Sequence, residues 1–142
     1  FTIELWAYPT SVASYNFMYD SRPQGTNGWY PLLYAYQGTL YYNTNNVDRI
    51  TASSAFTVNV WQHIAVSRVN GSTRLFVNGV QVGSTYTDTD VLINGASRPI
   101  IGADGVGQTL PYTGYIDDMR VTNGVGRYTG NFQPPTSQLQ DQ

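Results

Sequence analysis

The 142 residues fit one domain, and their composition, with 14% aromatic and 11% charged residues, predicts a tyrosine-rich, lightly charged surface around an apolar core. A net charge of −2 with scattered arginines argues against a nucleic-acid-binding protein, and no apolar run is long enough for a membrane span. The lack of cysteine excludes disulfides and cysteine-based zinc sites.

The chain opens on a strand pattern. Residues 1–8, F-T-I-E-L-W-A-Y, alternate, which places the odd-numbered residues on one face and the even-numbered residues on the other. No initiator methionine and no signal-peptide pattern precede this strand, so we interpret the chain as a fragment of a longer protein. Further strands are expected at 15–20, 32–36, 39–43 and 49–53.

The middle of the chain predicts a three-stranded meander over residues 61–84. Two Asn-Gly pairs, Asn70-Gly71 and Asn78-Gly79, divide it, and Asn-Gly favours tight hairpin turns because both residues accept positive φ. Many short strands without helical segments between them predict an all-β, antiparallel sandwich or jelly roll. Asn-Gly also occurs at 27–28, 94–95 and 123–124, and later strands are expected at 99–102 and 114–121.

The aromatic segment at residues 28–45, G-W-Y-P-L-L-Y-A-Y-Q-G-T-L-Y-Y-N-T-N, is the strongest candidate for a binding site. Alternation would place Tyr30, Tyr34 and Tyr36 on one strand face, as a ladder of rings spaced about 7 Å apart. Such a face suits stacking on sugar rings and equally suits a wet protein–protein interface. The structural alternative is that half of these rings fill the core. The candidate ligand-binding residues are Trp29, Tyr30, Tyr34, Tyr36, Tyr41 and Tyr42.

Two adjacent aspartates, Asp117 and Asp118, occur in G-Y-I-D-D-M-R-V at residues 114–121. Successive side chains of a strand point to opposite faces, so one aspartate is expected to face solvent and the other to point inward. An unpaired buried carboxylate is costly. The inward aspartate is therefore expected to pair with Arg120 or Arg68, or to accept backbone N–H groups.

Four other residues have simple structural interpretations. His63 is expected to be a structural hydrogen-bonding residue, because it has no metal or catalytic partners in the sequence. Trp6 and Trp61 are expected to pack in the core or on a sheet face. Asp104 lies in a glycine-rich loop, I-G-A-D-G-V-G, and is expected to cap a turn.

Five motifs in a fixed order carry a family resemblance. Residues 1–135 resemble a laminin G-like domain, a member of the concanavalin A-like lectin/glucanase jelly rolls, which implies two facing antiparallel sheets. Such domains usually have one or two further strands before the first motif, and residues 136–142 are interpreted as a tail or linker. The ending R-Y-T-G-N-F-Q-P-P is similar to versions of the domain in phage virion proteins and bacterial surface proteins. The motifs are F-T-I-E-L-W-A-Y-P, W-Q-H-I-A-V-S-R, L-F-V-N-G-V-Q-V-G, I-G-A and G-Y-I-D-D-M-R-V.

The resemblance also raises the question of calcium, which several related domains bind at a sheet rim. The candidate ligands are Glu4, Asp117 and Asp118, because the fold would place their strands side by side. Calcium takes six to eight oxygen ligands, and this chain has few acidic loops to supply them. The pairing of the aspartates within the protein is therefore favoured over calcium, and no other cofactor is expected.

Catalysis is not expected. Glucanases of this fold use two glutamates on one strand, whereas the chain has a single glutamate, Glu4, and no E-x-D-x-x-E pattern. The function expected is a non-catalytic binding or assembly module of a phage virion structural protein, such as a fibre, decoration or capsid-associated component. The alternative is a carbohydrate-binding adhesin domain of a bacterial surface protein. The expected partners are glycans or other subunits, and an oligomer is compatible with either function. The expected location is the virion, the extracellular space or the cell surface.

Overall fold

The computed structural model describes residues 1–93 and 99–140. These residues form ten β-strands and no helix, so the all-β prediction is confirmed, and the described part of the chain has no helix able to cross a membrane. The strands are β1 (Thr2–Pro9), β2 (Tyr15–Asp20), β3 (Leu32–Tyr36), β4 (Thr39–Thr44), β5 (Val47–Ala52), β6 (Gln62–Val69), β7 (Ser72–Val77), β8 (Val80–Thr87), β9 (Ile100–Ile101) and β10 (Gly114–Thr122).

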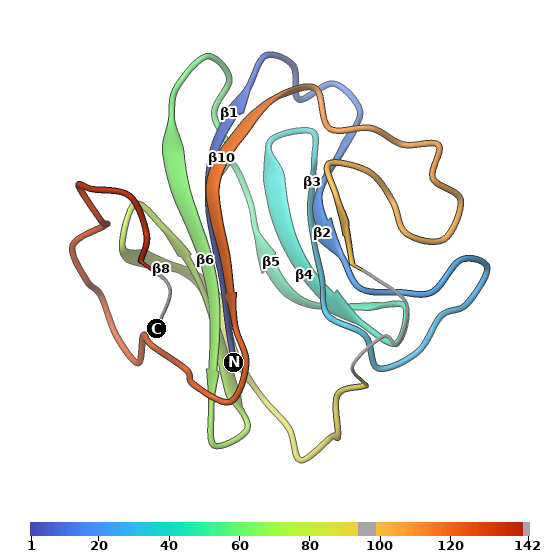
Figure 1. Cartoon of the computed structure of the whole chain (residues 1–142), viewed down its shortest axis with the longest axis vertical. Coiled ribbons are helices and arrows are strands. Elements are labelled where there is room, and N and C mark those ends of the chain that lie inside the picture. Colours follow the sequence, from blue (N-terminus) through green and yellow to red (C-terminus); the bar gives the residue numbers. More distant parts are fainter. Residues whose placement is uncertain (94–98, 141–142) are drawn as a thin grey trace.

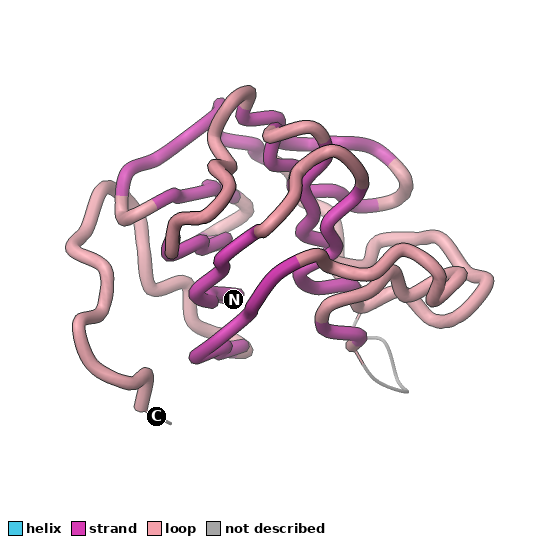
Figure 2. Tube along the Cα trace, turned by 90° about the horizontal axis from the view of Figure 1, so that it is seen from above, coloured by secondary structure: helices cyan, strands magenta, loops and turns pink. Residues whose placement is uncertain are grey.

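The strands form two antiparallel five-stranded sheets that lie face to face (Figure 1). The first sheet has the order β10-β1-β6-β7-β8, and the second has the order β5-β4-β3-β2-β9. Long loops extend beyond the strands at one side of the sandwich (Figure 2). The predicted two-sheet antiparallel sandwich is therefore present.

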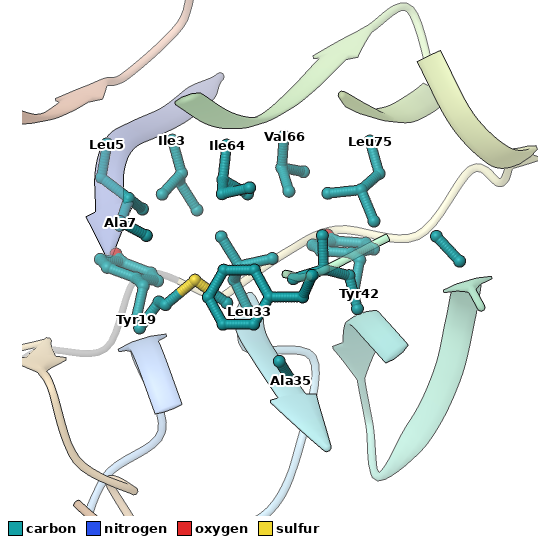
Figure 3. Close-up of a cluster of buried hydrophobic side chains, with 14 of the residues drawn as sticks. Ile3, Leu5, Ala7, Tyr19, Leu33, Ala35, Tyr42, Ile64, Val66 and Leu75 are labelled. Carbon is teal, nitrogen blue, oxygen red and sulfur yellow. The ribbon is translucent and has the colours of Figure 1, made fainter. Parts of the chain in front are cut away.

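The core lies between the sheets, because every second side chain of a strand points toward the opposite sheet. On β1 the odd-numbered residues Ile3, Leu5 and Ala7 are buried against the second sheet, as the alternation of the sequence predicts. Figure 3 shows apolar side chains of the two sheets pointing toward one another, with Leu33 and Tyr42 contributed by the second sheet. Burial of this apolar area is the main favourable term in folding.

The predicted meander is confirmed as β6, β7 and β8, but not every Asn-Gly pair makes a hairpin. Asn78 and Gly79 have φ values of 50° and 77°, as a tight turn with two positive φ values requires. The pair at 27–28 lies instead in the long loop between β2 and β3, and the pair at 123–124 follows β10. The pair at 94–95 lies outside the described residues.

The β4–β5 hairpin turns at a pair of residues that the sequence analysis did not single out. Asn45 and Asn46 have φ values of 52° and 59°, so they form the turn without glycine, because asparagine tolerates the left-handed region better than most residues. As a result β5 begins at Val47, two residues before the predicted start. The predicted strand at 99–102 is reduced to the two residues of β9.

The segment after β10 runs along the outside of the first sheet, where Figure 1 shows it in red. The Tyr128 amide donates to Ser67 Oγ at 3.0 Å, and the Phe132 amide donates to the Gly79 carbonyl at 2.8 Å. The Tyr128 and Phe132 rings stack with centroids 3.6 Å apart. This segment therefore covers part of the first sheet's outer face. It does not cover the outer face of the second sheet.

Candidate functional site

The outer face of the second sheet carries a stack of aromatic rings contributed by three neighbouring strands. Tyr34 on β3 lies opposite Phe17 on β2 and Tyr41 on β4, with ring centroids 5.3 and 4.8 Å away. Tyr36 lies opposite Tyr15, and these rings stack at 4.5 Å. Cross-strand pairs of this kind are the unit by which side chains stabilise a sheet. We call this surface the tyrosine face: Tyr15, Phe17, Tyr34, Tyr36 and Tyr41.

The tyrosine face exists because alternation sends the intervening residues of β3 into the core. Leu33 and Ala35 are fully buried, so Tyr34 and Tyr36 point outward. Tyr15 is 39% exposed and the other three tyrosines are half-buried, whereas Phe17 is covered by its neighbours. The face is a platform of ring edges and planes rather than a deep pocket.

A carboxylate lies at the edge of the tyrosine face. The Tyr34 hydroxyl donates to Asp48 Oδ1 at 2.8 Å, and Asn43 Nδ2 donates to the same oxygen at 2.7 Å. Burial, and then the hydrogen bond and charge of Asp48, raise the pKa of Tyr34 well above its usual range, so its hydroxyl stays protonated. Asp48 Oδ2 has no hydrogen-bond partner among the described residues, which leaves it as an acceptor for a ligand.

Two loops flank the tyrosine face on the β2 side. Residues 21–31 and 102–113 lie side by side, since the Gly25 amide donates to the Val106 carbonyl at 3.1 Å. The buried Asp20 carboxylate joins them by accepting the Gly105 amide at 2.7 Å. In Figure 1 both loops project on the side of the second sheet that faces away from the first.

Asp104 organises the second of these loops. Its carboxylate accepts four backbone N–H groups at 2.6 to 3.1 Å, from Gly107 to Leu110, so the predicted turn role is confirmed. Burial acts to raise the pKa of Asp104, but these four amides outweigh it and lower the pKa below its ordinary value.

Of the six predicted ligand-binding residues, the tyrosine face holds three: Tyr34, Tyr36 and Tyr41. Tyr42 is 1% exposed and lies in the core, because adjacent strand residues point to opposite faces and Tyr41 points outward. The expectation that Tyr42 joins a surface site is therefore wrong.

Trp29 and Tyr30 also lie outside the tyrosine face. The strand begins at Leu32, after Pro31, which has no N–H for a sheet ladder, so Tyr30 belongs to the preceding loop and the single-strand ladder does not form. The Trp29 ring lies under the Arg49 guanidinium at 5.1 Å. Arg49 in turn lies 5.2 Å from the ring of Tyr86, on β8 of the first sheet, so Trp29 takes part in a contact between the sheets.

The sequence analysis missed Tyr15 and Phe17. The signal was available in part, because both residues occupy alternate positions of the strand predicted at 15–20. Their contribution depends on the pairing of β2 with β3, however, and the long connection between these strands does not fix that pairing.

The acidic pair departs from ideal strand geometry. The register between β1 and β10 shifts between Glu4 and Trp6, and Asp118 takes a positive φ of 48°. Because a bulge re-aims side chains, Asp117 and Asp118 both line one groove instead of opposite faces. Neither aspartate pairs with Arg120 or Arg68, and both accept backbone N–H groups instead, which is the other arrangement expected. Asp117 Oδ1 accepts the Asp118 amide, and the Asp118 carboxylate accepts the Leu139 amide at 2.9 and 3.0 Å.

Glu4 is the centre of a buried ion cluster on the outer face of the first sheet. Its side chain is fully buried, and Arg120 donates to Oε1 at 2.7 and 3.0 Å while the Tyr128 hydroxyl donates to Oε2 at 2.7 Å. His63, also fully buried, places Nε2 3.3 Å from Oε2. Burial acts against the charged form, but the contacts with His63, Tyr128 and Arg120 prevail and lower the pKa of Glu4 to about 2.

The structure brings Asp117 and Asp118 together but does not add Glu4 to them. Among residues 1–93 and 99–140, no group of three or more His, Cys, Asp or Glu side chains is arranged to hold a metal ion. The Glu4 oxygens are occupied by Arg120 and Tyr128. Of the three candidate calcium ligands, Asp117 and Asp118 are therefore the two that remain.

We therefore expect calcium to leave the stability of the domain unchanged. A structural ion stabilises the state that binds it by mass action, so chelation would lower the melting temperature if Asp117 or Asp118 held one. The measurement is thermal unfolding of the protein with EGTA and with excess calcium. A melting temperature that falls with EGTA and recovers with calcium would contradict the expectation, and loss of that response in Asp118→Asn would locate the ion.

The two facing antiparallel sheets define a class of protein, the antiparallel β-sandwiches. A laminin G family model, described as the concanavalin A-like lectin/glucanases superfamily, matches residues 1–125, and the chain belongs to that superfamily. No curated protein matches the chain in sequence.

Solved structures with the same fold include carbohydrate-binding domains. The CBM40 of the Ruminococcus gnavus IT-sialidase, bound to α2,3-sialyllactose, aligns with a TM-score of 0.64 at 18% identity, over 83% of this chain and 71% of that one. Domain 4 of AbnA, a GH43 extracellular arabinanase from Geobacillus stearothermophilus, in complex with arabinotriose, aligns with a TM-score of 0.56 at 18% identity, over 83% and 57%. The leech intramolecular trans-sialidase aligns with a TM-score of 0.67 at 16% identity, over 83% and 20%.

Proposed function

We propose that the chain is a non-catalytic carbohydrate-binding domain that holds a neutral glycan on the tyrosine face. The observation that carries the proposal is the cross-strand stack of Tyr15, Phe17, Tyr34, Tyr36 and Tyr41 beside an open carboxylate oxygen of Asp48. A sugar ring has an apolar C–H face that packs on an aromatic ring and hydroxyl groups that need acceptors. Tyrosine supplies both an apolar body and a polar end.

Of the two functions expected from the sequence, the comparisons support carbohydrate binding better than a virion role. Similar folds in complex with sialyllactose and arabinotriose show that sandwiches of this shape bind sugars in other proteins. The proposal includes a location outside the cell, where glycans of this kind are found. A catalytic function has no support, because the single glutamate is buried and its oxygens are occupied.

The charge of the tyrosine face favours a neutral sugar over a sialic acid. Within the described part of the chain, Asp48 is the charged side chain that contacts this face, and a carboxylate ligand would be repelled by it. Two arginines of the described residues beside this sheet are engaged: Arg22 pairs with Asp20 at 2.6 Å, and Arg49 lies between two aromatic rings. Arginine is the side chain best suited to hold a carboxylate ligand, because it donates two parallel hydrogen bonds.

The proposal predicts the behaviour of the protein on a glycan array with neutral and sialylated oligosaccharides. The parent should bind neutral glycans, and Tyr34→Ala with Tyr36→Ala should weaken that binding strongly, because each lost stacking contact is worth about 0.5–1.5 kcal/mol beyond its buried area. Binding confined to sialylated glycans, or no binding by the parent, would reject the proposed ligand class.

The matched control is Tyr34→Phe with Tyr36→Phe. This variant keeps both rings and removes both hydroxyl groups, including the one that donates to Asp48. Retained binding would show that the ring faces hold the sugar, and thermal unfolding of all three proteins would separate lost binding from lost structure. A folded alanine variant that binds like the parent would remove the tyrosine face from the site.

A further inference from the structure

A second row of aromatic side chains, two of them exposed and one half-buried, lies on the opposite side of the sandwich. Tyr115 on β10, Tyr8 on β1 and Trp61, directly before β6, occupy matching positions on three adjacent strands. The Tyr8 ring centroid lies 5.9 Å from that of Tyr115 and 5.5 Å from that of Trp61. Tyr115 is 63% exposed and Trp61 is 43% exposed. We call these three residues the Trp61 row.

Packing within the fold does not account for the exposure of the Trp61 row. Elsewhere on this sheet face the C-terminal segment covers aromatic rings, where Phe132 packs on His63 and Phe76. No comparable contact of that segment reaches Trp61 or Tyr115 among the described residues. Trp61 therefore lies on a sheet face, one of the two positions that the sequence analysis expected for it. Contiguous exposed apolar side chains usually mark a binding surface.

The Trp61 row continues into a polar groove one register step away. Trp6 lies opposite Asp117, two residues along from Tyr8 and Tyr115, so both point to the same face as the row. The groove has a volume of about 890 Å³ and lies between this edge and the C-terminal segment. It is lined by Trp6, Asp117, Asp118, Thr136, Ser137 and Gln138, together with apolar neighbours.

We propose that the Trp61 row and this groove form a second binding surface, for a chain of neutral sugars. The row spans two strand spacings, about 10 Å, which is a suitable length for consecutive sugar rings to pack on. The groove beside it supplies carboxylate, hydroxyl and amide groups that exchange hydrogen bonds with sugar hydroxyls. Asp117 and Asp118 repel acidic sugars, and the mixture of rings and acceptors suits a glycan better than an apolar peptide.

The two surfaces lie on the outer faces of opposite sheets, so one domain would contact two polysaccharide chains or two segments of one chain. Linked binding events raise the apparent affinity without any new contact. The second surface would bind the same class of ligand as the proposed function, so the inference rests on that proposal. It depends on different residues, so an experiment can reject one surface and leave the other in place.

The test is affinity gel electrophoresis in gels that contain debranched arabinan, galactan, mannan or xylan. Four proteins are compared: the parent, Trp61→Ala with Tyr115→Ala, Tyr34→Ala with Tyr36→Ala, and the variant with all four changes. We expect the Trp61 and Tyr115 changes to weaken retardation by at least about tenfold in apparent affinity. The tyrosine-face variant should keep a residual retardation that the fourfold variant loses.

Several results would overturn the second surface. One is a folded Trp61 and Tyr115 variant that migrates like the parent in every gel, and another is a parent that none of the polysaccharides retards. A third is a concentration-dependent dimer of the parent, measured by sedimentation without polysaccharide and lost in this variant, which would assign the row to a second copy. Should the double variant unfold, Tyr115→Ala alone carries the test, because its side chain is the most exposed of the row.

Discussion

Replacing Glu4 by alanine should destabilise the domain by about 3–5 kcal/mol, because removing one partner of a buried ion pair leaves the other without compensation. The partner left behind is Arg120, and the Tyr128 hydroxyl loses its acceptor as well. Since Tyr128 belongs to the segment that covers the first sheet, the loss should spread to that segment. Thermal or urea unfolding measures the effect, and the melting temperature should fall by about 10 °C or more.

The same carboxylate predicts an acid limit to stability. The pKa of Glu4 is about 2 in the folded protein and 4.5 in its ordinary state, so its charged form stabilises the fold above about pH 4.5. That contribution is lost as the pH falls from about 4.5 to about 2. In Glu4→Gln the stability should depend less on pH over this range than in the parent.

Asp117→Ala provides the control for both Glu4 measurements, because this carboxylate is exposed on the neighbouring strand. Its removal should change the free energy of unfolding by about 0.5 kcal/mol or less. A Glu4→Ala variant as stable as the parent, or an unchanged pH profile in Glu4→Gln, would show that the ion cluster contributes nothing to stability.

Changing Gly79 to valine should cost about 2–4 kcal/mol, because two separate constraints act on this residue. Its φ of 77° is strained for a β-branched side chain. In addition, a Cβ at this position would collide with the backbone carbonyl of Phe132, and a backbone group cannot move aside as a flexible side chain can. Unfolding measurements should therefore show a large loss, together with release of the C-terminal segment.

Gly130 is the matched control for the Gly79 substitution. It lies in the same C-terminal segment, its φ is outside the left-handed region, and an added Cβ would meet no atom within 4 Å. Gly130→Val should leave the melting temperature nearly unchanged. Equal stability of the two variants would mean that the Asn78–Gly79 turn and its contact with Phe132 are not formed as described.

The strands and their faces could be predicted from the sequence because they depend on local alternation. Ile3, Leu5 and Ala7 read as one face in the sequence and are buried together in the structure. The turn at Asn78 and Gly79 was predictable for the same reason, since its backbone conformation depends on two residues alone. The Asn45–Asn46 turn was less evident, because asparagine does not mark a left-handed turn as strongly as glycine.

The candidate site was predictable only in part, because it depends on which strands become neighbours. Tyr34, Tyr36 and Tyr41 belong to one hairpin and were identified together, whereas Tyr15 and Phe17 join them through a pairing across a long loop. The bulge at Asp118 likewise requires knowledge of its partner strand and of the segment that packs on it. Trp61 and Tyr115 become a row only through the pairing of the first and last strands with β6.

The most direct test of the central claim is an NMR titration of the ¹⁵N-labelled domain with the neutral oligosaccharide that binds best on the array. A sugar on the tyrosine face should shift the backbone amide resonances of Tyr15, Tyr34, Tyr36 and Tyr41, with saturation at the affinity measured by array or calorimetry. The Tyr34→Phe and Tyr36→Phe control should give the same pattern. Saturable binding that leaves all four amide resonances in place would contradict a glycan site on the tyrosine face.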